Sequence, residues 1–165
     1  MSFITDFQRA RANNEPYKVF RSIFNVSQTL DDFIDFAKNS LDGRYRDQSK
    51  GIHLREGLYP DMMPFDHTFD FFNLMKDSYA DDYHDQNSFT MLISELDTYR
   101  YSGLTGVPAH SDPQDNIHWN CIGESLWLIN GDELTLYPGD ILYIKSGITH
   151  DVKTLKPRAA IIFSI

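Results

Sequence analysis

The 165-residue sequence predicts a mainly β domain with flanking helices, whose strands form a barrel or a double-sheet jelly roll. Short runs of β-forming residues separated by turn residues fill the chain from residue 88 onward. Clear helical spacing of apolar residues occurs only before that point. A hydrophobic content of 41% and an aromatic content of 14% are those of a globular chain with a real core. We therefore expect a single domain over 1–165, with 1–87 as a helical and irregular cover and 88–165 as the jelly-roll core.

Three helices are predicted in the first half, over residues 3–12, 30–39 and 68–79. The middle helix is the clearest, because its apolar residues fall on one face and Thr29 can cap its first turn. The alternating run 17–24 predicts a strand. Residues 43–66 carry turn formers and little periodicity, so they predict mostly irregular structure with one short strand near 51–55.

Eight short strands are predicted in the second half, at 89–96, 98–101, 117–122, 125–129, 133–137, 141–145, 150–154 and 159–164. Turn-forming residues stand between these runs. Asn130-Gly131 is the strongest hairpin signal, because both residues tolerate the positive φ of a two-residue turn. Gly123 and Pro157 likewise predict breaks between neighbouring strands. This number and spacing of strands is typical of barrels and jelly rolls.

Charge and cysteine content exclude some classes of function. The formal net charge of −9 disfavours duplex nucleic acid as a partner, because phosphate contacts need Lys and Arg. Cys121 is the only cysteine, so an internal disulfide and a Cys-based zinc site are excluded, and we expect it to pack as a small hydrophobe. Residues 1–9 lack the apolar stretch of a secretory signal, and no run approaches a membrane span. We therefore expect a soluble, cytoplasmic protein without a membrane partner.

Three residues of the second half form a candidate metal-binding set. His110 and Asp112 are separated by one residue, so on a strand both side chains would point to the same face. His150 starts a later predicted strand after the turn Ser146-Gly147. Two imidazoles and a carboxylate suit Fe(II), and also Mn, Co, Ni or Zn. Three protein ligands leave coordination positions open, which favours a catalytic or ligand-binding site over structural zinc.

Other residues are candidates for the same interior. His118 lies in an alternating run, so its side chain can point into the barrel as a pocket residue. Trp119 and Trp127 can line a pocket or fill the core. The sequence leaves these alternatives open.

Two segments carry a resemblance to a known family. The segment from Pro138-Gly139-Asp140 to Gly147-Ile148-Thr149-His150 resembles the second metal motif of cupins and JmjC-type oxygenases, in which a Pro-Gly-Asp turn starts a strand ending in Gly-x-x-His. The segment 110–116, followed by the segment 122–127, resembles the first half of the same metal site. The resemblance covers residues 100–165 and implies a double-stranded β-helix, Fe(II), and 2-oxoglutarate as co-substrate. Asp112, where cupins usually have a second histidine, favours the oxygenase branch.

Carried over by position, the resemblance makes His110, Asp112 and His150 the metal ligands and the catalytic centre. JmjC hydroxylases also carry a lysine or arginine that pairs with the distal carboxylate of 2-oxoglutarate, beside a conserved tryptophan. Here Ser125 stands at that position. A buried dicarboxylate needs a cation, because an unpaired charge is costly in a low-dielectric pocket.

Arg158 is the candidate replacement for that cation. It lies eight residues after His150, which resembles the arrangement in prolyl hydroxylases. The alternative is a solvated arginine after Pro157. The co-substrate is also expected to receive a hydroxyl group from Tyr101, Tyr143 or Thr149.

Three functions remain open from the sequence. The first is an Fe(II)- and 2-oxoglutarate-dependent oxygenase that hydroxylates an unknown protein or small-molecule substrate. The second is a metal-binding cupin without 2-oxoglutarate, acting as a substrate-chelating dioxygenase or an isomerase, and the missing charge at Ser125 favours it. The third is a non-catalytic, ligand-binding jelly roll. A homodimer is a further open alternative, because JmjC-like hydroxylases are often dimers.

Overall fold

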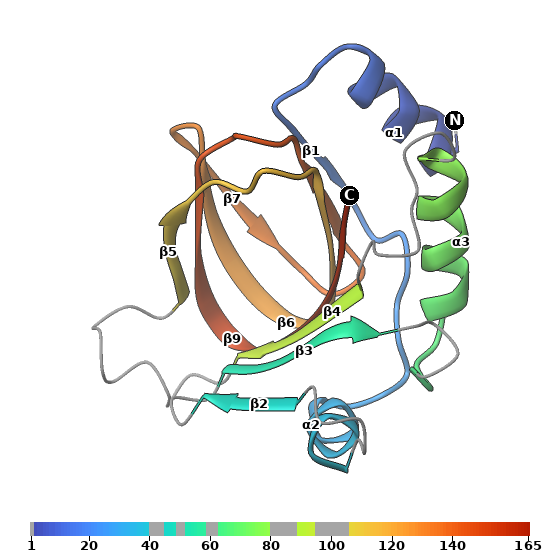
Figure 1. The fold of residues 1–165 in the computed structure, drawn as a ribbon, viewed down its shortest axis with the longest axis vertical. Helices are drawn as coiled ribbons and strands as arrows, with labels where there is room; N and C mark the ends of the chain where they lie inside the picture. Colours follow the sequence, from blue (N-terminus) through green and yellow to red (C-terminus); the bar gives the residue numbers. More distant parts are fainter. Residues whose placement is uncertain (1, 40–44, 49–51, 59–62, 80–88, 95–105) are drawn as a thin grey trace.

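The computed structural model describes residues 2–39, 45–48, 52–58, 63–79, 89–94 and 106–165. Within them the elements, in chain order, are α1 (Phe3–Ala12), β1 (Tyr17–Phe20), α2 (Leu30–Asn39), β2 (Tyr45–Gln48), β3 (Ile52–Leu58), α3 (Thr68–Ser78), β4 (Phe89–Ser94), β5 (Gly106–His110), β6 (Asn116–Ile129), β7 (Asp132–Leu136), β8 (Ile141–Ile144) and β9 (His150–Ser164). Figure 1 shows the strands rolled around a common interior, with α1 and α3 along one flank and α2 below β2 and β3. The prediction of a mainly β jelly roll with flanking helices is confirmed.

Among the described residues, all the strand pairs are antiparallel and belong to one sheet. The main path runs β1-β8-β6-β9-β4-β3-β2, while β5 pairs with β9 and β7 pairs with β6. Strand β9 therefore contacts β4, β5 and β6. The two-residue turn Asn130-Gly131 between β6 and β7 has φ values of 52° and 93°, which confirms the predicted hairpin.

The predicted breaks at Gly123 and Pro157 are wrong. Strands β6 and β9 run continuously through these residues, and their pairing register shifts between Asn120 and Ser125. Gly123 has a φ of 78°, and a Cβ atom there would lie 2.1 Å from the Pro157 carbonyl oxygen. The two turn-forming residues therefore mark one shared bulge, where two long strands bend together and approach closely.

The three predicted helices are confirmed, with ends within one residue of those expected. Thr29 caps α2 as predicted, because the Asp32 backbone N–H donates to its hydroxyl while the Asp32 carboxylate accepts from the Thr29 N–H at 2.7 Å. Each helix buries a phenylalanine, namely Phe7, Phe33 and Phe71, against the outer face of the sheet.

The buried apolar residues form two clusters on opposite faces of the sheet. Strand β8 shows the division, because Ile141 and Tyr143 belong to the cluster that the helices cover, whereas Leu142 and Ile144 belong to the other. We call the first cluster the helix-side core and the second the barrel interior. Cys121 is buried in the helix-side core, as expected of a small hydrophobe.

The sheet also takes in strands from before residue 88, where the sequence predicted mostly helices and irregular structure. Strand β1 pairs with β8, and β3 pairs with β2 and β4. The Asp140 carboxylate fixes the start of β8, because it accepts from the Ser22 and Tyr137 backbone N–H groups and from Arg21. In the described part of the chain, each helix is too short and too polar to cross a bilayer.

Candidate metal centre

The structure brings His110, Asp112 and His150 together where β5 pairs with β9. His110 is the last residue of β5 and pairs with His150, the first residue of β9. The Asp112 Oδ2 atom lies 3.8 Å from His110 Nε2 and 3.5 Å from His150 Nε2. One ligand atom from each of the three residues lies within 4.8 Å of the other two.

Asp112 reaches this position from a loop and not from a strand. The sequence placed His110 and Asp112 on one strand, but β5 ends at His110. The loop is held by a hydrogen bond of 2.8 Å from the Gly147 N–H to the Asp112 carbonyl. The Asn116 side-chain amide donates to Asp112 Oδ2 at 2.5 Å, and the Ser164 hydroxyl donates to Asn116. These contacts orient the carboxylate toward the histidines, and sequence reasoning missed the role of Asn116.

His150 is held in a state that suits metal binding. Its Nδ1 lies 2.9 Å from the Ile148 carbonyl oxygen, so Nδ1 carries the proton and Nε2 presents its lone pair. The side chain is 2% exposed. Burial lowers the pKa of His150, although the bond to the Ile148 carbonyl acts in the opposite direction. The ring is therefore neutral at physiological pH.

The three side chains fit a divalent metal ion by their chemistry and their access. Bonds of about 2.1 Å from nitrogen and carboxylate oxygen place two donors at most about 4.2 Å apart, so small side-chain rotations suffice to close the set. His110 and Asp112 are partly exposed, whereas His150 faces the interior. An ion held there would have protein on one side and open coordination positions toward solvent.

Trp127 connects this set to the rest of the barrel interior. Its ring centroid lies 5.9 Å from that of His150 and 4.8 Å from that of His118, and the Arg158 guanidinium carbon lies 5.8 Å from it. The indole N–H donates to the Ser125 hydroxyl at 2.9 Å. Trp127 thus lines the interior beside the candidate ligands. Trp119 instead packs in the helix-side core.

Arg158 lies inside the barrel with a relative exposure of 1%. The alternative of a solvated arginine after Pro157 is therefore wrong. Its strand pairs it with Ser94 of β4, which is also buried. Because an arginine side chain stays charged at any ordinary pH, Arg158 brings a positive charge into the interior, which makes the interior electrostatically suited to an anion.

Further polar side chains share this interior with Arg158. Within the described residues, hydrogen-bond partners are missing for the Ser94 and Thr154 hydroxyls, the Asn120 side-chain oxygen and both His118 ring nitrogens. We call these four residues the inner polar cluster. Buried polar atoms normally form hydrogen bonds with protein groups or with ordered water. A cluster of buried polar atoms without such partners therefore indicates a site for a ligand or for water. Polar residues at inward positions of otherwise apolar strands were the available sequence signal, and only His118 was recognised.

Of the hydroxyl groups expected to bind a co-substrate, the two that the structure describes, those of Tyr143 and Thr149, do not lie in this interior. Tyr143 lies on the opposite face of β8, where its ring packs against Phe7 at 5.5 Å and its hydroxyl donates to Asp115 at 3.3 Å. The expected role of Tyr143 is therefore wrong, because strand alternation turns it into the helix-side core. Thr149 is exposed and lines a small surface hollow of about 200 Å³ beside His150. Tyr101 lies outside the described residues.

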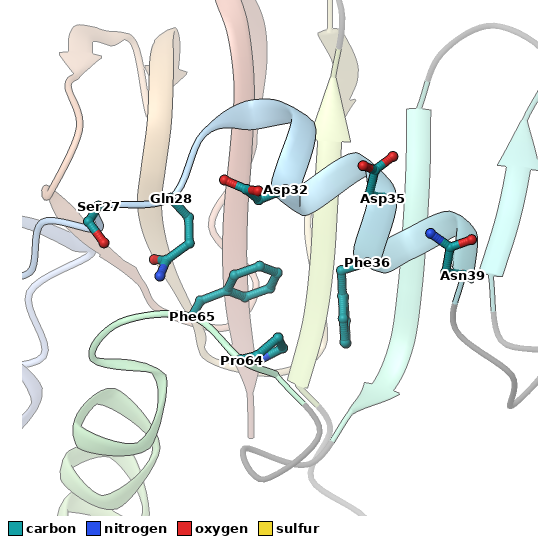
Figure 2. A pocket seen from close by; sticks show the side chains of 8 residues that line it. All are labelled: Ser27, Gln28, Asp32, Asp35, Phe36, Asn39, Pro64 and Phe65. Atoms are coloured by element: carbon teal, nitrogen blue, oxygen red, sulfur yellow. The ribbon is translucent and has the colours of Figure 1, made fainter.

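A larger surface pocket, of about 550 Å³, lies between α2 and the segment before α3 and contains none of the three candidate ligands. Figure 2 shows Asp32, Asp35 and Asn39 along α2, with Phe36 and Phe65 facing the pocket. The Asp32 carboxylate is engaged by Thr29 at the helix start. This pocket belongs to the helical cover.

Similarity to solved structures supports the fold. No protein-family model and no curated protein matches the chain. Solved structures of YcfD from Escherichia coli, described as a ribosomal oxygenase, are similar with TM-scores of 0.63, 0.59 and 0.56 at 15–16% identity, and the last is a complex with cobalt and succinic acid. The alignments cover 99%, 90% and 90% of this chain. They cover 53%, 47% and 47% of the YcfD chains, so this chain spans about half the length of YcfD. The chain therefore shares its jelly-roll fold with these YcfD structures.

Proposed function

We propose that this chain is an Fe(II)- and 2-oxoglutarate-dependent oxygenase that hydroxylates a protein or small-molecule substrate. The observation that carries the proposal is that His110, Asp112 and His150 lie together, with His150 and the buried cation Arg158 both close to the Trp127 ring. A metal-binding set with a buried cation nearby suits a ligand that chelates a metal at one end and carries a carboxylate at the other.

His110, Asp112 and His150 would hold the iron, whose chemistry when bound is the activation of oxygen for C–H hydroxylation. The chain supplies orientation. The bond from His150 Nδ1–H to the Ile148 carbonyl fixes the ring, and Asn116 fixes the Asp112 carboxylate. The exposed sides of His110 and Asp112 leave room for a substrate to approach from solvent.

Arg158 would hold the far carboxylate of 2-oxoglutarate. Pairing with a dianion offsets the desolvation of the buried guanidinium, and charge-assisted hydrogen bonds in a dry interior are among the strongest available. Trp127, 1% exposed, would form an apolar wall along the bound co-substrate and exclude water from it.

One observation favours a second candidate, a metal-binding cupin without 2-oxoglutarate. Ser125 stands where JmjC hydroxylases carry their cation, and its hydroxyl accepts from the Trp127 indole. The second candidate would use the substrate itself as a metal ligand, or the metal as a Lewis acid. It differs from the first in predicting that 2-oxoglutarate does not bind.

Metal analysis combined with a 2-oxoglutarate titration tests the proposal. We expect the wild-type chain to bind one iron and to release succinate from 2-oxoglutarate, and His110→Ala to lose the iron. Arg158→Met should retain iron but weaken 2-oxoglutarate binding at least tenfold, because a charged hydrogen bond contributes about 1.5–3 kcal/mol. The control Lys153→Met removes an exposed cation from the same strand and should change neither.

Each alternative has its own signature in this experiment. Metal binding without 2-oxoglutarate binding would support the second candidate. A chain that takes up no metal even after reconstitution would contradict both and leave a non-catalytic jelly roll. An Arg158→Met variant with wild-type affinity for 2-oxoglutarate would show that the co-substrate assignment of Arg158 is wrong.

A further inference from the structure

His118 is a buried polar residue that the proposed function does not use. Its side chain extends from β6 into the barrel interior and is 8% exposed. Its ring stands edge-on to Trp127, with 4.8 Å between centroids and an interplanar angle of 68°. Both ring nitrogens lack a hydrogen-bond partner among the residues that the structure describes. A histidine that served only for packing would leave two buried polar atoms without hydrogen bonds, which is rare in protein interiors.

His118, the candidate ligand His150 and the buried cation Arg158 all lie close to the Trp127 ring. Burial, followed by the charge of Arg158 and then by His150 and His110, lowers the pKa of His118 well below its usual value. The ring is therefore neutral and offers one N–H donor and one acceptor nitrogen. Its strand is paired on both sides, with Leu142 of β8 and Ile162 of β9 opposite it, so its position in the wall is fixed.

The polar side chains buried in the same interior can supply several hydrogen-bond donors. The Ser94 and Thr154 hydroxyls can donate or accept, the Arg158 guanidinium only donates, and the Asn120 side-chain oxygen accepts. An ionised carboxylate only accepts hydrogen bonds and has about four lone-pair sites, so it matches several donors at once. A cation would instead be repelled by the Arg158 guanidinium.

We propose that His118 binds the carboxylate that Arg158 holds, by donating its neutral N–H from the β6 wall, and thereby selects a dicarboxylate. This inference rests on the proposed function, because it assigns His118 to the co-substrate of that site. Arg158 supplies the charge, whereas the rigid position of His118 determines how deep the carboxylate lies. His118 is thus a specificity-determining binding residue.

The first test observes the wild-type ring directly. Histidine labelled with ¹⁵N in the full chain reports the His118 ring nitrogens by NMR, and the His118→Gln spectrum assigns them. Succinate is added to the metal-free protein, with calorimetry on the same sample to measure binding. We expect the His118 nitrogen signals to shift in proportion to occupancy. Binding of succinate with unchanged His118 signals would overturn the inference.

The second test compares variants by calorimetric titration with succinate and with 2-oxoglutarate. His118→Leu should weaken both affinities about tenfold or more, as expected for a hydrogen bond to a charged group. His118→Gln keeps a side-chain donor and should stay within a few-fold of wild type. The matched control Leu142→Ala opens the same interior opposite His118 but removes no donor, so it should also stay within a few-fold.

The outcomes separate this inference from the proposed function. If wild type binds and Arg158→Met does not, but His118→Leu retains wild-type affinity, only the role of His118 is wrong. A loss in Leu142→Ala as large as in His118→Leu would assign the effect to packing and overturn the inference. Displacement of succinate by equimolar inorganic phosphate would contradict selection of a dicarboxylate. If wild type binds neither dicarboxylate, the proposed function and this inference both fail.

Discussion

Replacing Gly123 by alanine probes the bulge that joins β6 and β9. Gly123 has a φ of 78°, which costs a residue with a Cβ atom about 1–2 kcal/mol. The new Cβ would lie 2.1 Å from the Pro157 carbonyl oxygen and 2.8 Å from the Arg158 Cα and Cβ atoms. These are backbone or near-backbone contacts, so a strand must shift, which adds about 1–3 kcal/mol. We expect the free energy of unfolding to fall by about 2–5 kcal/mol, a large part of the stability of an ordinary domain.

Urea denaturation measures this change, and Gly131→Ala is the matched control. Gly131 also has a positive φ, of 93°, but a Cβ atom there would meet nothing within 4 Å. The control should therefore lose only the backbone part, about 1–2 kcal/mol. If Gly123→Ala destabilises the chain no more than Gly131→Ala does, the close approach of the two strands does not exist in solution. Folded Gly123→Ala should also bind 2-oxoglutarate more weakly, because the shift moves the backbone of Arg158.

Three further predictions concern other buried groups. Asp140→Asn should lower the free energy of unfolding by about 1–3 kcal/mol, because its buried carboxylate accepts from two backbone amides and an arginine, and an unchanged melting temperature would contradict this. The lowered pKa values of His118 and His150 mean that the unfolded chain binds more protons than the folded one below pH about 6.5. The metal-free protein should therefore have its full stability above that pH and lose stability as the pH falls, and the loss should be shallower in His118→Gln. Urea denaturation at several pH values measures this, and urea midpoints that do not change from pH 7.5 to 5 would refute the burial of neutral imidazoles. Tyr143→Phe should leave 2-oxoglutarate affinity unchanged, since its hydroxyl faces Asp115, and a tenfold loss would restore its expected role.

The sequence best predicted those elements that are determined by residues close to one another in the chain. The helix over 30–39 has a periodic apolar face and a capping pair, Thr29 and Asp32, and both features act within a few residues. The Asn130-Gly131 hairpin is equally local. His110, Asp112 and His150 were grouped by their residue types and spacing, and the structure brings them together.

The errors come from contacts between segments that are distant in the sequence. Gly123 and Pro157 each look like turn residues, and only the approach of β6 to β9 makes them parts of one bulge. All four residues of β8 are bulky and apolar or aromatic, so no alternation in the sequence shows that Tyr143 faces the helices. The contacts that hold Asp112 include the Gly147 backbone amide, which leaves no trace in residue type.

The course of β9 limits how this site can vary. The strand begins at His150, carries Arg158 in its middle, and is hydrogen-bonded to β4, β5 and β6. Because neighbouring side chains of a strand point to opposite faces, deleting a single residue between these two would turn one of them out of the barrel. Substitutions along β9 can therefore change the shape and polarity of this pocket. Insertions and deletions, in contrast, are confined to loops such as Asn130-Gly131.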